Sequence, residues 1–234
     1  MSPVRINVVT IFPETMDAIF ATGMLAVAGK KGIVEFRAVS PRAFAADVHR
    51  TVDDTPFGGG PGMVMMAPPI VEAVESLGAR PGSPVILMSP AGARFDQDAA
   101  HRLARETELT FVCGRYKGVD ERVRELIVTE EISIGDFVLS GGEIAAAAVI
   151  EAVVRLQSDV LGNEESGATD SFAAGRDRLL DCAWYTRPAE YRGFKAPEVL
   201  LSGHHAEIEK WRRRSSLDRT RRYRPDLIDN EKIS

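Results

Sequence analysis

The chain has little cysteine and no long apolar run. Its 234 residues include two cysteines, Cys113 and Cys182, which are too few and too far apart for a zinc knuckle or a disulfide framework. Cys113 ends an apolar run and is expected to be a small buried side chain. No apolar stretch approaches the ~18 residues needed to span a bilayer. We therefore expect a cytoplasmic protein with no membrane partner.

Two common nucleotide-binding motifs are also missing. Residues 53–63 (DDTPFGGGPGM) are rich in glycine, but they lack the Gly-Lys-Ser/Thr ending of a P-loop and the G-x-G-x-x-G spacing of a dinucleotide fold. A phosphate cradle is therefore weakly supported. We expect a loop that lies close to a ligand or to another stretch of backbone.

Basic residues are scarce relative to acidic ones, except in one segment. The net charge is -5, yet residues 210–224 carry +7, which leaves -12 for the rest of the chain. The basic residues of this segment are Lys210, Arg212, Arg213, Arg214, Arg219, Arg221, Arg222 and Arg224. Because phosphate contacts depend on local charge, the segment predicts an arm that binds a polyanion. The alternative is a solvated helix face that pairs with the acidic body or with a partner chain.

Strands and helices are predicted to alternate over the first two thirds of the chain. The pattern favours strands at residues 5–12, 32–40, 85–88, 109–113 and 132–139, and helices from Pro13 and at 68–77, 96–107, 119–126 and 142–157. Such alternation predicts an α/β fold with a parallel sheet, in which ligands bind beyond the carboxyl ends of the strands. Three turns rich in small residues, 89–92, 114–118 and 133–143, fall at those ends. They predict a site for a small cofactor.

Eight short motifs are distributed over nearly the whole chain. They are residues 8–13 (VVTIFP), 57–63 (FGGGPGM), 113–116 (CGRY), 133–143 (SIGDFVLSGGE), 170–172 (DSF), 179–182 (LLDC), 185–188 (YTRP) and 202–205 (SGHH). Because these motifs occur together and in this order, the chain resembles the bacterial tRNA (guanine-N1)-methyltransferases of the SPOUT class. That family methylates guanine 37, the nucleotide just 3′ of the anticodon.

The resemblance implies a domain organisation and a cofactor. Residues 1–157 would form a SPOUT-type parallel sheet with a deep trefoil knot, 158–178 an interdomain linker or lid, and 179–234 a small, mainly α-helical domain that binds tRNA. S-adenosylmethionine is the implied methyl donor, and magnesium an additional requirement of the family. The implied cofactor-binding residues are Leu87, Ser89, Pro90, Gly114, Tyr116, Ser133, Ile134, Gly135, Asp136, Phe137, Val138, Leu139, Gly141 and Gly142.

The resemblance also implies a homodimer whose active site is shared between subunits, with the lid of one chain closing over the cofactor of the other. Asp170 is then the candidate general base for the guanine N1 proton, and Arg155 the group that stabilises negative charge on O6. Judged without the family, Asp170 is an ordinary loop acid, and Arg155 pairs with Glu151 on a helix surface.

Other residues are candidates for contact with tRNA. They are Asp181, which otherwise caps a helix, His204 and His205, which otherwise have a structural role, and Arg212, Arg213 and Arg214. We expect tRNA and a second copy of the chain as partners, and no DNA. The alternatives are another SPOUT enzyme that acts on ribose 2′-oxygens or on ribosomal RNA, and a non-catalytic RNA-binding protein.

Two departures from the family pattern bear on the site. Lys117 stands where the family usually has a glutamate, and a cation there opposes a metal ion at that position. The lid is extended by Arg176, Asp177 and Arg178. We expect the lysine to affect the metal requirement and the longer lid to affect its closure.

Overall fold

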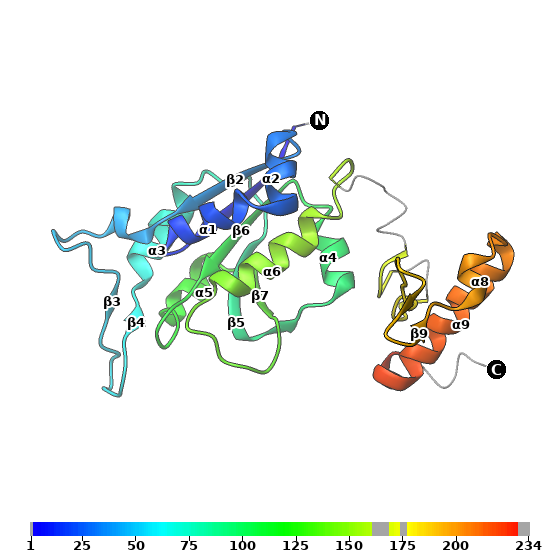
Figure 1. Cartoon of the computed structure of the whole chain (residues 1–234). Helices are drawn as coiled ribbons and strands as arrows, with labels where there is room; N and C mark the ends of the chain where they lie inside the picture. The colour runs from blue at the N-terminus through cyan, green and yellow to red at the C-terminus, as the bar shows by residue number, and fades with distance from the viewer. Residues whose placement is uncertain (1, 161–168, 174–176, 229–234) are drawn as a thin grey trace. The chain divides into compact units, whose positions relative to one another are not determined.

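The computed structural model describes residues 2–160, 169–173 and 177–228 (Figure 1). The chain divides into two compact units, residues 1–162 and 163–234. The first unit contains β1 (Val4–Val9), α1 (Pro13–Phe20), α2 (Gly23–Lys30), β2 (Val34–Val39), the 3-10 helix η1 (Pro41–Phe44), β3 (Asp53–Asp54), β4 (Val64–Met65), α3 (Ala67–Glu75), β5 (Val85–Arg94), α4 (Gln97–Leu103), β6 (Glu108–Cys113), α5 (Glu121–Ile127), β7 (Glu130–Ser133) and α6 (Glu143–Val154).

A five-stranded sheet with the order β2-β1-β6-β5-β7 forms the centre of the first unit. Every neighbouring pair in it is parallel, so the predicted parallel α/β fold is confirmed. All six residues of the central strand β6 are buried. This burial follows from a sheet that is covered on both faces. The two polar residues of β6, Glu108 and Thr110, are buried as well, and Glu108 accepts hydrogen bonds from Arg5 (2.6 Å) and Asn7 (3.1 Å).

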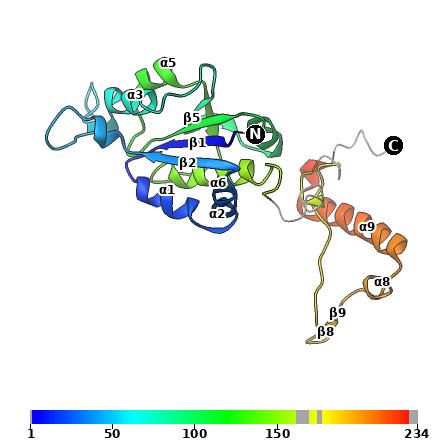
Figure 2. The ribbon, with the colours of Figure 1, turned by 90° about the horizontal axis from the view of Figure 1, so that it is seen from above.

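Helices cover the two faces of the sheet in separate layers, as Figure 2 shows, with α1, α2 and α6 on one face and α3 and α5 on the other. Side chains of a strand alternate between faces, so each strand contributes to two cores. Ile6 and Phe111 pack with Met16 and Ile150 in one core. Val9, Leu87 and Val112 pack with Ile70 and Val123 in the other.

The predicted strand at 132–139 is wrong beyond Ser133, where β7 ends. β7 is an edge strand, and among the described residues it pairs with β5 alone. β5 ends at Arg94, and the next residue, Phe95, donates its N–H to the Ser133 carbonyl (2.8 Å) before α4 begins. Residues 134–139 therefore have no strand with which to pair, and they form a loop. The helix predicted at 96–107 is also shorter, since α4 ends at Leu103.

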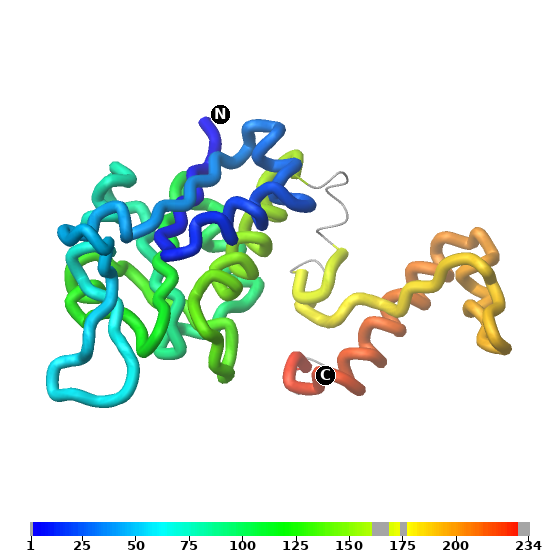
Figure 3. The backbone as a smooth tube through the Cα atoms, turned by 60° about the vertical axis from the view of Figure 1, so that its left-hand side comes forward, coloured from blue at the N-terminus to red at the C-terminus, as the bar shows by residue number. Residues whose placement is uncertain are grey.

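The second unit is built around α9 (His205–Tyr223), preceded by β8 (Glu190–Tyr191), β9 (Phe194–Lys195) and α8 (Glu198–Leu201) and followed by the 3-10 helix η3 (Pro225–Leu227). The extended segment 180–183 runs beside α9, as the tube in Figure 3 shows. Hydroxyl groups join the two. The Leu180 N–H donates to Thr220 Oγ1 (3.0 Å), and the Ala183 N–H donates to Ser215 Oγ (3.0 Å). The segment is thereby fixed along the basic helix.

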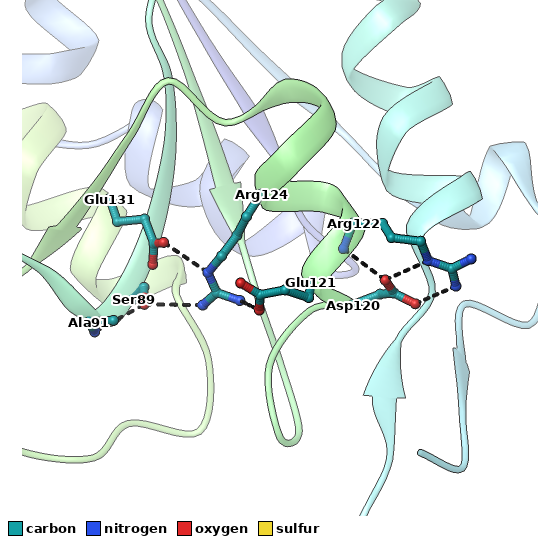
Figure 4. A network of polar contacts seen from close by, with 7 residues as sticks. All are labelled: Ser89, Ala91, Asp120, Glu121, Arg122, Arg124 and Glu131. Atoms are coloured by element: carbon teal, nitrogen blue, oxygen red, sulfur yellow. Dashed lines mark hydrogen bonds and ion pairs between the residues drawn. The ribbon is translucent and has the colours of Figure 1, made fainter. Parts of the chain in front are cut away.

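The helix α5 begins at an aspartate cap that gives a stability prediction. Asp120 Oδ1 accepts a hydrogen bond from the Arg122 N–H (2.9 Å), and the two side chains form an ion pair of 2.6 Å (Figure 4). The hydrogen bonds from the Arg122 side chain lower the pKa of Asp120 from its ordinary value of 3.8 to about 2. Asp120→Ala should lower the free energy of unfolding by about 1 kcal/mol at pH 7.

The contribution of this carboxylate should depend on pH in one direction. A carboxyl group whose pKa is lower in the folded state stabilises the fold above the unfolded pKa. The difference between wild type and Asp120→Ala in urea unfolding should therefore shrink as the pH falls from 4 towards 2. Asp120→Asn keeps an acceptor for the cap and serves as the uncharged control. A difference that stays constant over this range would contradict the assignment.

Candidate functional site

Three segments line a cavity of about 360 Å³: the stretch of β5 where its ladder with β7 is interrupted, between Met88 and Ala93, and the loops that follow β6 and β7. Twelve of the fourteen residues expected to bind a cofactor line this cavity. They are Ser89, Pro90, Gly114, Tyr116, Ser133, Ile134, Gly135, Phe137, Val138, Leu139, Gly141 and Gly142. The three small-residue segments therefore converge as predicted, but the prediction of a turn at 89–92 is wrong, because β5 continues to Arg94.

The other two expected residues do not line the cavity. Leu87 is 2% exposed and belongs to the core on the face of the sheet that α3 and α5 cover. Asp136 is exposed in the loop after β7. Arg115 and Lys117 contribute to the lining instead.

The loop after β6 and the loop after β7 approach each other closely. The Gly142 N–H donates to the Gly114 carbonyl, at a distance of 3.0 Å. A Cβ atom at Gly142 would lie 2.9 Å from the Cα of Cys113, a distance that side chains do not tolerate. Glycine is therefore required at this position, for packing against β6. Cys113 itself is buried, as expected, and burial raises the pKa of its thiol.

A buried polar cluster ties these loops to the first strand. Glu143, the first residue of α6, is 2% exposed. Its carboxylate accepts hydrogen bonds from Thr10 Oγ1 (2.6 Å) and from Arg115 Nε (3.1 Å). The Arg115 guanidinium also lies 4.5 Å from the centre of the Phe12 ring. A carboxylate at a helix amino terminus is further stabilised by the helix dipole.

Thr10, Arg115 and Glu143 were not among the residues expected to shape the site. Arg115 and Glu143 belong to the CGRY and SIGDFVLSGGE motifs, so the motifs contained a signal. The pairing between the two motifs is tertiary, however, and no local pattern reveals it.

A second polar network, shown in Figure 4, reaches Ser89 in the cavity lining. Arg124 on α5 donates to Glu131 Oε1 on β7 (2.8 Å) and to Glu121 Oε2 (2.8 Å), and its Nη2 lies 3.5 Å from Ser89 Oγ. Burial opposes ionisation of Glu131, but hydrogen bonds from Arg124 and Ser89 outweigh it and lower the pKa of the carboxyl group. Arg124 therefore helps to position Ser89 from behind the cavity.

Arg155, the expected electrostatic catalyst, lies at the other end of α6 from the cavity. It is the C-cap residue of this helix, while Gly142 and Glu143 are at the amino terminus. Twelve helical residues separate the two ends, which corresponds to about 18 Å along the axis. Arg155 is thus not brought to the cavity of its own chain by α6.

Asp170 and Asp181 lie in the second unit, and Asp181 contacts Ser171, the residue that follows Asp170. Asp170 belongs to a turn in which its carbonyl accepts from the Ala173 N–H (3.2 Å). The neighbouring Ser171 Oγ accepts from the Asp181 N–H (2.9 Å). The Asp181 carboxylate accepts from the Cys182 N–H (2.7 Å) and from Trp184 Nε1 (2.6 Å). Of the added lid residues, Arg176 lies outside the described residues.

The remaining tRNA candidates lie on or next to α9. His204 is the N-cap residue of the helix and His205 is its first residue, and both are exposed. The side chains of Arg213 and Arg214 are 78% and 84% exposed, with i,i+4 ion pairs to Glu209 (3.5 Å) and Asp218 (3.7 Å). Exposed pairs of this kind are weak, so these guanidinium groups can exchange their partners for phosphates.

The described part of the chain contains neither a metal-binding cluster nor a membrane-spanning helix. Residues 2–160, 169–173 and 177–228 hold no group of three His, Cys, Asp or Glu side chains arranged to bind a metal ion. Within the same residues, no helix is long and apolar enough to cross a bilayer.

Comparisons with known proteins identify the family. A family model described as tRNA (Guanine-1)-methyltransferase TrmD matches residues 4–230. A protein named tRNA (guanine-N(1)-)-methyltransferase from Moorella thermoacetica is 52% identical over 235 residues, which cover 98% of this chain and 92% of that protein. Proteins of the same name from Brevibacillus brevis and Geobacter sulfurreducens are 51% and 49% identical, and the alignments cover 96% and 98% of this chain and 91% and 93% of theirs.

The parallel α/β fold, the cavity at its strand ends and these matches define an enzyme of the tRNA methyltransferase class. The chain belongs to the tRNA (guanine-1)-methyltransferase family, TrmD. The resemblance inferred from the eight motifs is therefore confirmed, and the enzyme is a tRNA (guanine-N1)-methyltransferase.

Proposed function

We propose that the chain transfers a methyl group from S-adenosylmethionine to N1 of guanine 37 in tRNA, and that it does so in the cytoplasm as a homodimer. The observation that carries this proposal is the cavity between β5 and the loops after β6 and β7. Twelve of the residues implied by the family pattern line it. Membership of the family gives the base and the atom.

The cavity fits a ligand of the size and polarity of S-adenosylmethionine. Its volume of about 360 Å³ lies in the usual range for small-molecule sites, roughly 300–1,000 Å³. The backbone of residues 134–139 would hold the adenine, while Ser89, Pro90, Gly114 and Tyr116 form the facing walls. When bound, S-adenosylmethionine supplies the methyl group that its sulfonium carries. Magnesium fits less well, because among the described lining residues there is no carboxylate and Lys117 adds a cation, so we derive no step through a metal ion.

We infer that the cavity loops belong to a trefoil knot of the SPOUT type. Support comes from the way in which the loop after β7 returns across the end of β6. Arg115 and Gly141 form an isolated antiparallel bridge, and Gly142 follows with its hydrogen bond to Gly114. A segment that crosses back over an earlier strand end is what such a knot requires.

Two side chains would act on the guanine in this mechanism. Asp170 would accept the proton of N1, so that the nitrogen lone pair becomes available. The guanidinium of Arg155 would stabilise the negative charge that develops on O6 when that proton leaves. Asp170 would act in the cavity of the second subunit, over which its lid would close.

A transfer assay with labelled S-adenosylmethionine tests the proposal. A tRNA with guanine at position 37 should accept label, and a tRNA in which only this guanine is replaced should not. Mass spectrometry of the digested product should place the methyl group on the base at N1. Label on a ribose 2′-oxygen, or equal labelling of the substituted tRNA, would contradict the proposal and favour another SPOUT activity.

We propose that the basic face of α9 binds the phosphates of tRNA. Replacing Arg212, Arg213 and Arg214 together by alanine should weaken tRNA binding and lower the slope of log K against log salt concentration by about 2 to 3. The variant with lysine at all three positions keeps the charges and is the matched control. An unchanged slope in the alanine variant, measured by filter binding at several salt concentrations, would mean that these arginines have a structural role.

A further inference from the structure

A tryptophan lies exposed on the second unit, beside the basic helix α9. The side chain of Trp184 is 63% exposed, although tryptophan offers more apolar surface than any other residue. The Arg212 guanidinium lies 4.9 Å from the centre of its ring. The indole is therefore held next to the basic helix while most of its surface faces solvent.

Asp181 fixes the orientation of this ring. One carboxylate oxygen accepts the indole N–H of Trp184 (2.6 Å) and the other accepts the Cys182 N–H (2.7 Å). The Asp181 backbone is held as well, because its N–H donates to Ser171 Oγ and its carbonyl accepts from Arg219 Nε (3.1 Å). An exposed ring with so few degrees of freedom loses little conformational entropy when a flat ligand binds to it.

The surroundings of Trp184 indicate the chemistry of that ligand. Arg213 and Arg214 extend into solvent from the next positions of α9. Tyr185 is half exposed and contacts Trp211 edge to face, with ring centres 6.2 Å apart. Aromatic faces beside guanidinium groups are typical of surfaces that bind unpaired nucleotides, where bases stack on rings and cations hold the phosphates.

We propose that Trp184 stacks on an unpaired nucleobase of the bound tRNA, with Arg212 beside the ring and Asp181 as the residue that positions it. The inference rests on the proposed function, since it takes tRNA as the substrate. It adds a contact to a base other than the one that is methylated, and this contact depends on the π-face of the base and tolerates any base identity.

Fluorescence tests the stacking directly. The chain has two tryptophans, so Trp211→Phe leaves Trp184 as the only indole. Addition of an unmodified tRNA transcript should quench the emission of this variant, because a stacked base contacts the indole. Emission that stays unchanged at saturating tRNA would overturn the proposal.

Affinity supplies the second measurement. Trp184→Leu should weaken tRNA binding about 5- to 150-fold, which corresponds to one stacked base, and should leave the salt slope unchanged because no charge is removed. Trp184→Phe retains a ring and should lose less. Phe194→Leu, at a residue that is 83% exposed on β9, is the matched control and should bind as the wild type does. Equal affinities of Trp184→Leu and wild type would overturn the proposal.

The outcome can be separated from that of the proposed function. The loss in Trp184→Leu should appear in KM for tRNA, while kcat at saturating tRNA and the affinity for S-adenosylmethionine stay within about twofold of wild type. Failure of the wild-type chain to methylate guanine-bearing tRNA would refute the proposed function. Normal methylation together with an unaltered KM in Trp184→Leu would refute only the stacking contact.

Discussion

Asp170→Asn is expected to slow methyl transfer by about 10²- to 10⁴-fold, the usual contribution of a general base. The amide has the shape of the carboxylate, but it does not accept the proton of guanine N1. Binding of S-adenosylmethionine should remain unchanged, because the residues that line the cavity belong to the first unit. Single-turnover assays with tRNA would measure the rate, and calorimetry would measure cofactor affinity.

A second acid in the same segment provides the control. Asp177 is exposed, and Asp177→Asn makes the same chemical change without removing the proposed base. Its single-turnover rate should match that of wild type. If Asp170→Asn transferred methyl groups as fast as Asp177→Asn, Asp170 would not be the general base, and another group would have to accept the proton.

Glu143→Ala should lower the free energy of unfolding by about 1 to 3 kcal/mol, as expected when the acceptor of a partly buried hydrogen-bonded cluster is removed. The substitution leaves the Arg115 guanidinium and the Thr10 hydroxyl without the carboxylate that they contact. Arg115 lies in the loop after β6 and lines the cavity, so we also expect weaker binding of S-adenosylmethionine. Urea unfolding and calorimetry would measure the two effects.

The interpretation can be checked on the same helix and with a double variant. Glu151 is exposed on α6, and Glu151→Ala should change stability by no more than about 0.5 kcal/mol. Combining Glu143→Ala with Arg115→Ala should cost less than the sum of the single changes, because the two side chains interact. Strict additivity would show that Glu143 acts through packing alone.

The sequence predicted most of the sheet because apolar β-branched runs mark buried parallel strands. The runs that became β1 and β6 are rich in β-branched and apolar residues, and the turn that follows β6 contains the small residues that a ligand site needs. The same criterion failed after Ser133, where Ile134, Phe137, Val138 and Leu139 continue an apolar run. Pairing with a neighbouring strand decides where a strand ends, and a single segment does not contain that information.

Individual site residues were harder to predict than the loops that carry them. Leu87 and Ser89 are two positions apart on β5, yet Leu87 packs in the core and Ser89 lines the cavity. The difference arises because the ladder between β5 and β7 is interrupted between Met88 and Ala93. The Arg115–Glu143 pair and the contact of Arg124 with Ser89 likewise join residues that are far apart in the sequence, so only the folded chain reveals them.

The order of the strands also determines when the nascent chain can fold. β1 lies between β2 and β6, and residues 5–9 pair with residues 108–112. During synthesis, the first strand must wait until more than one hundred further residues have left the ribosome before its second neighbour exists. Pairings this distant slow folding and leave an apolar strand edge exposed to aggregation in the meantime. Chaperone capture of chains arrested before β6 emerges is the expected consequence.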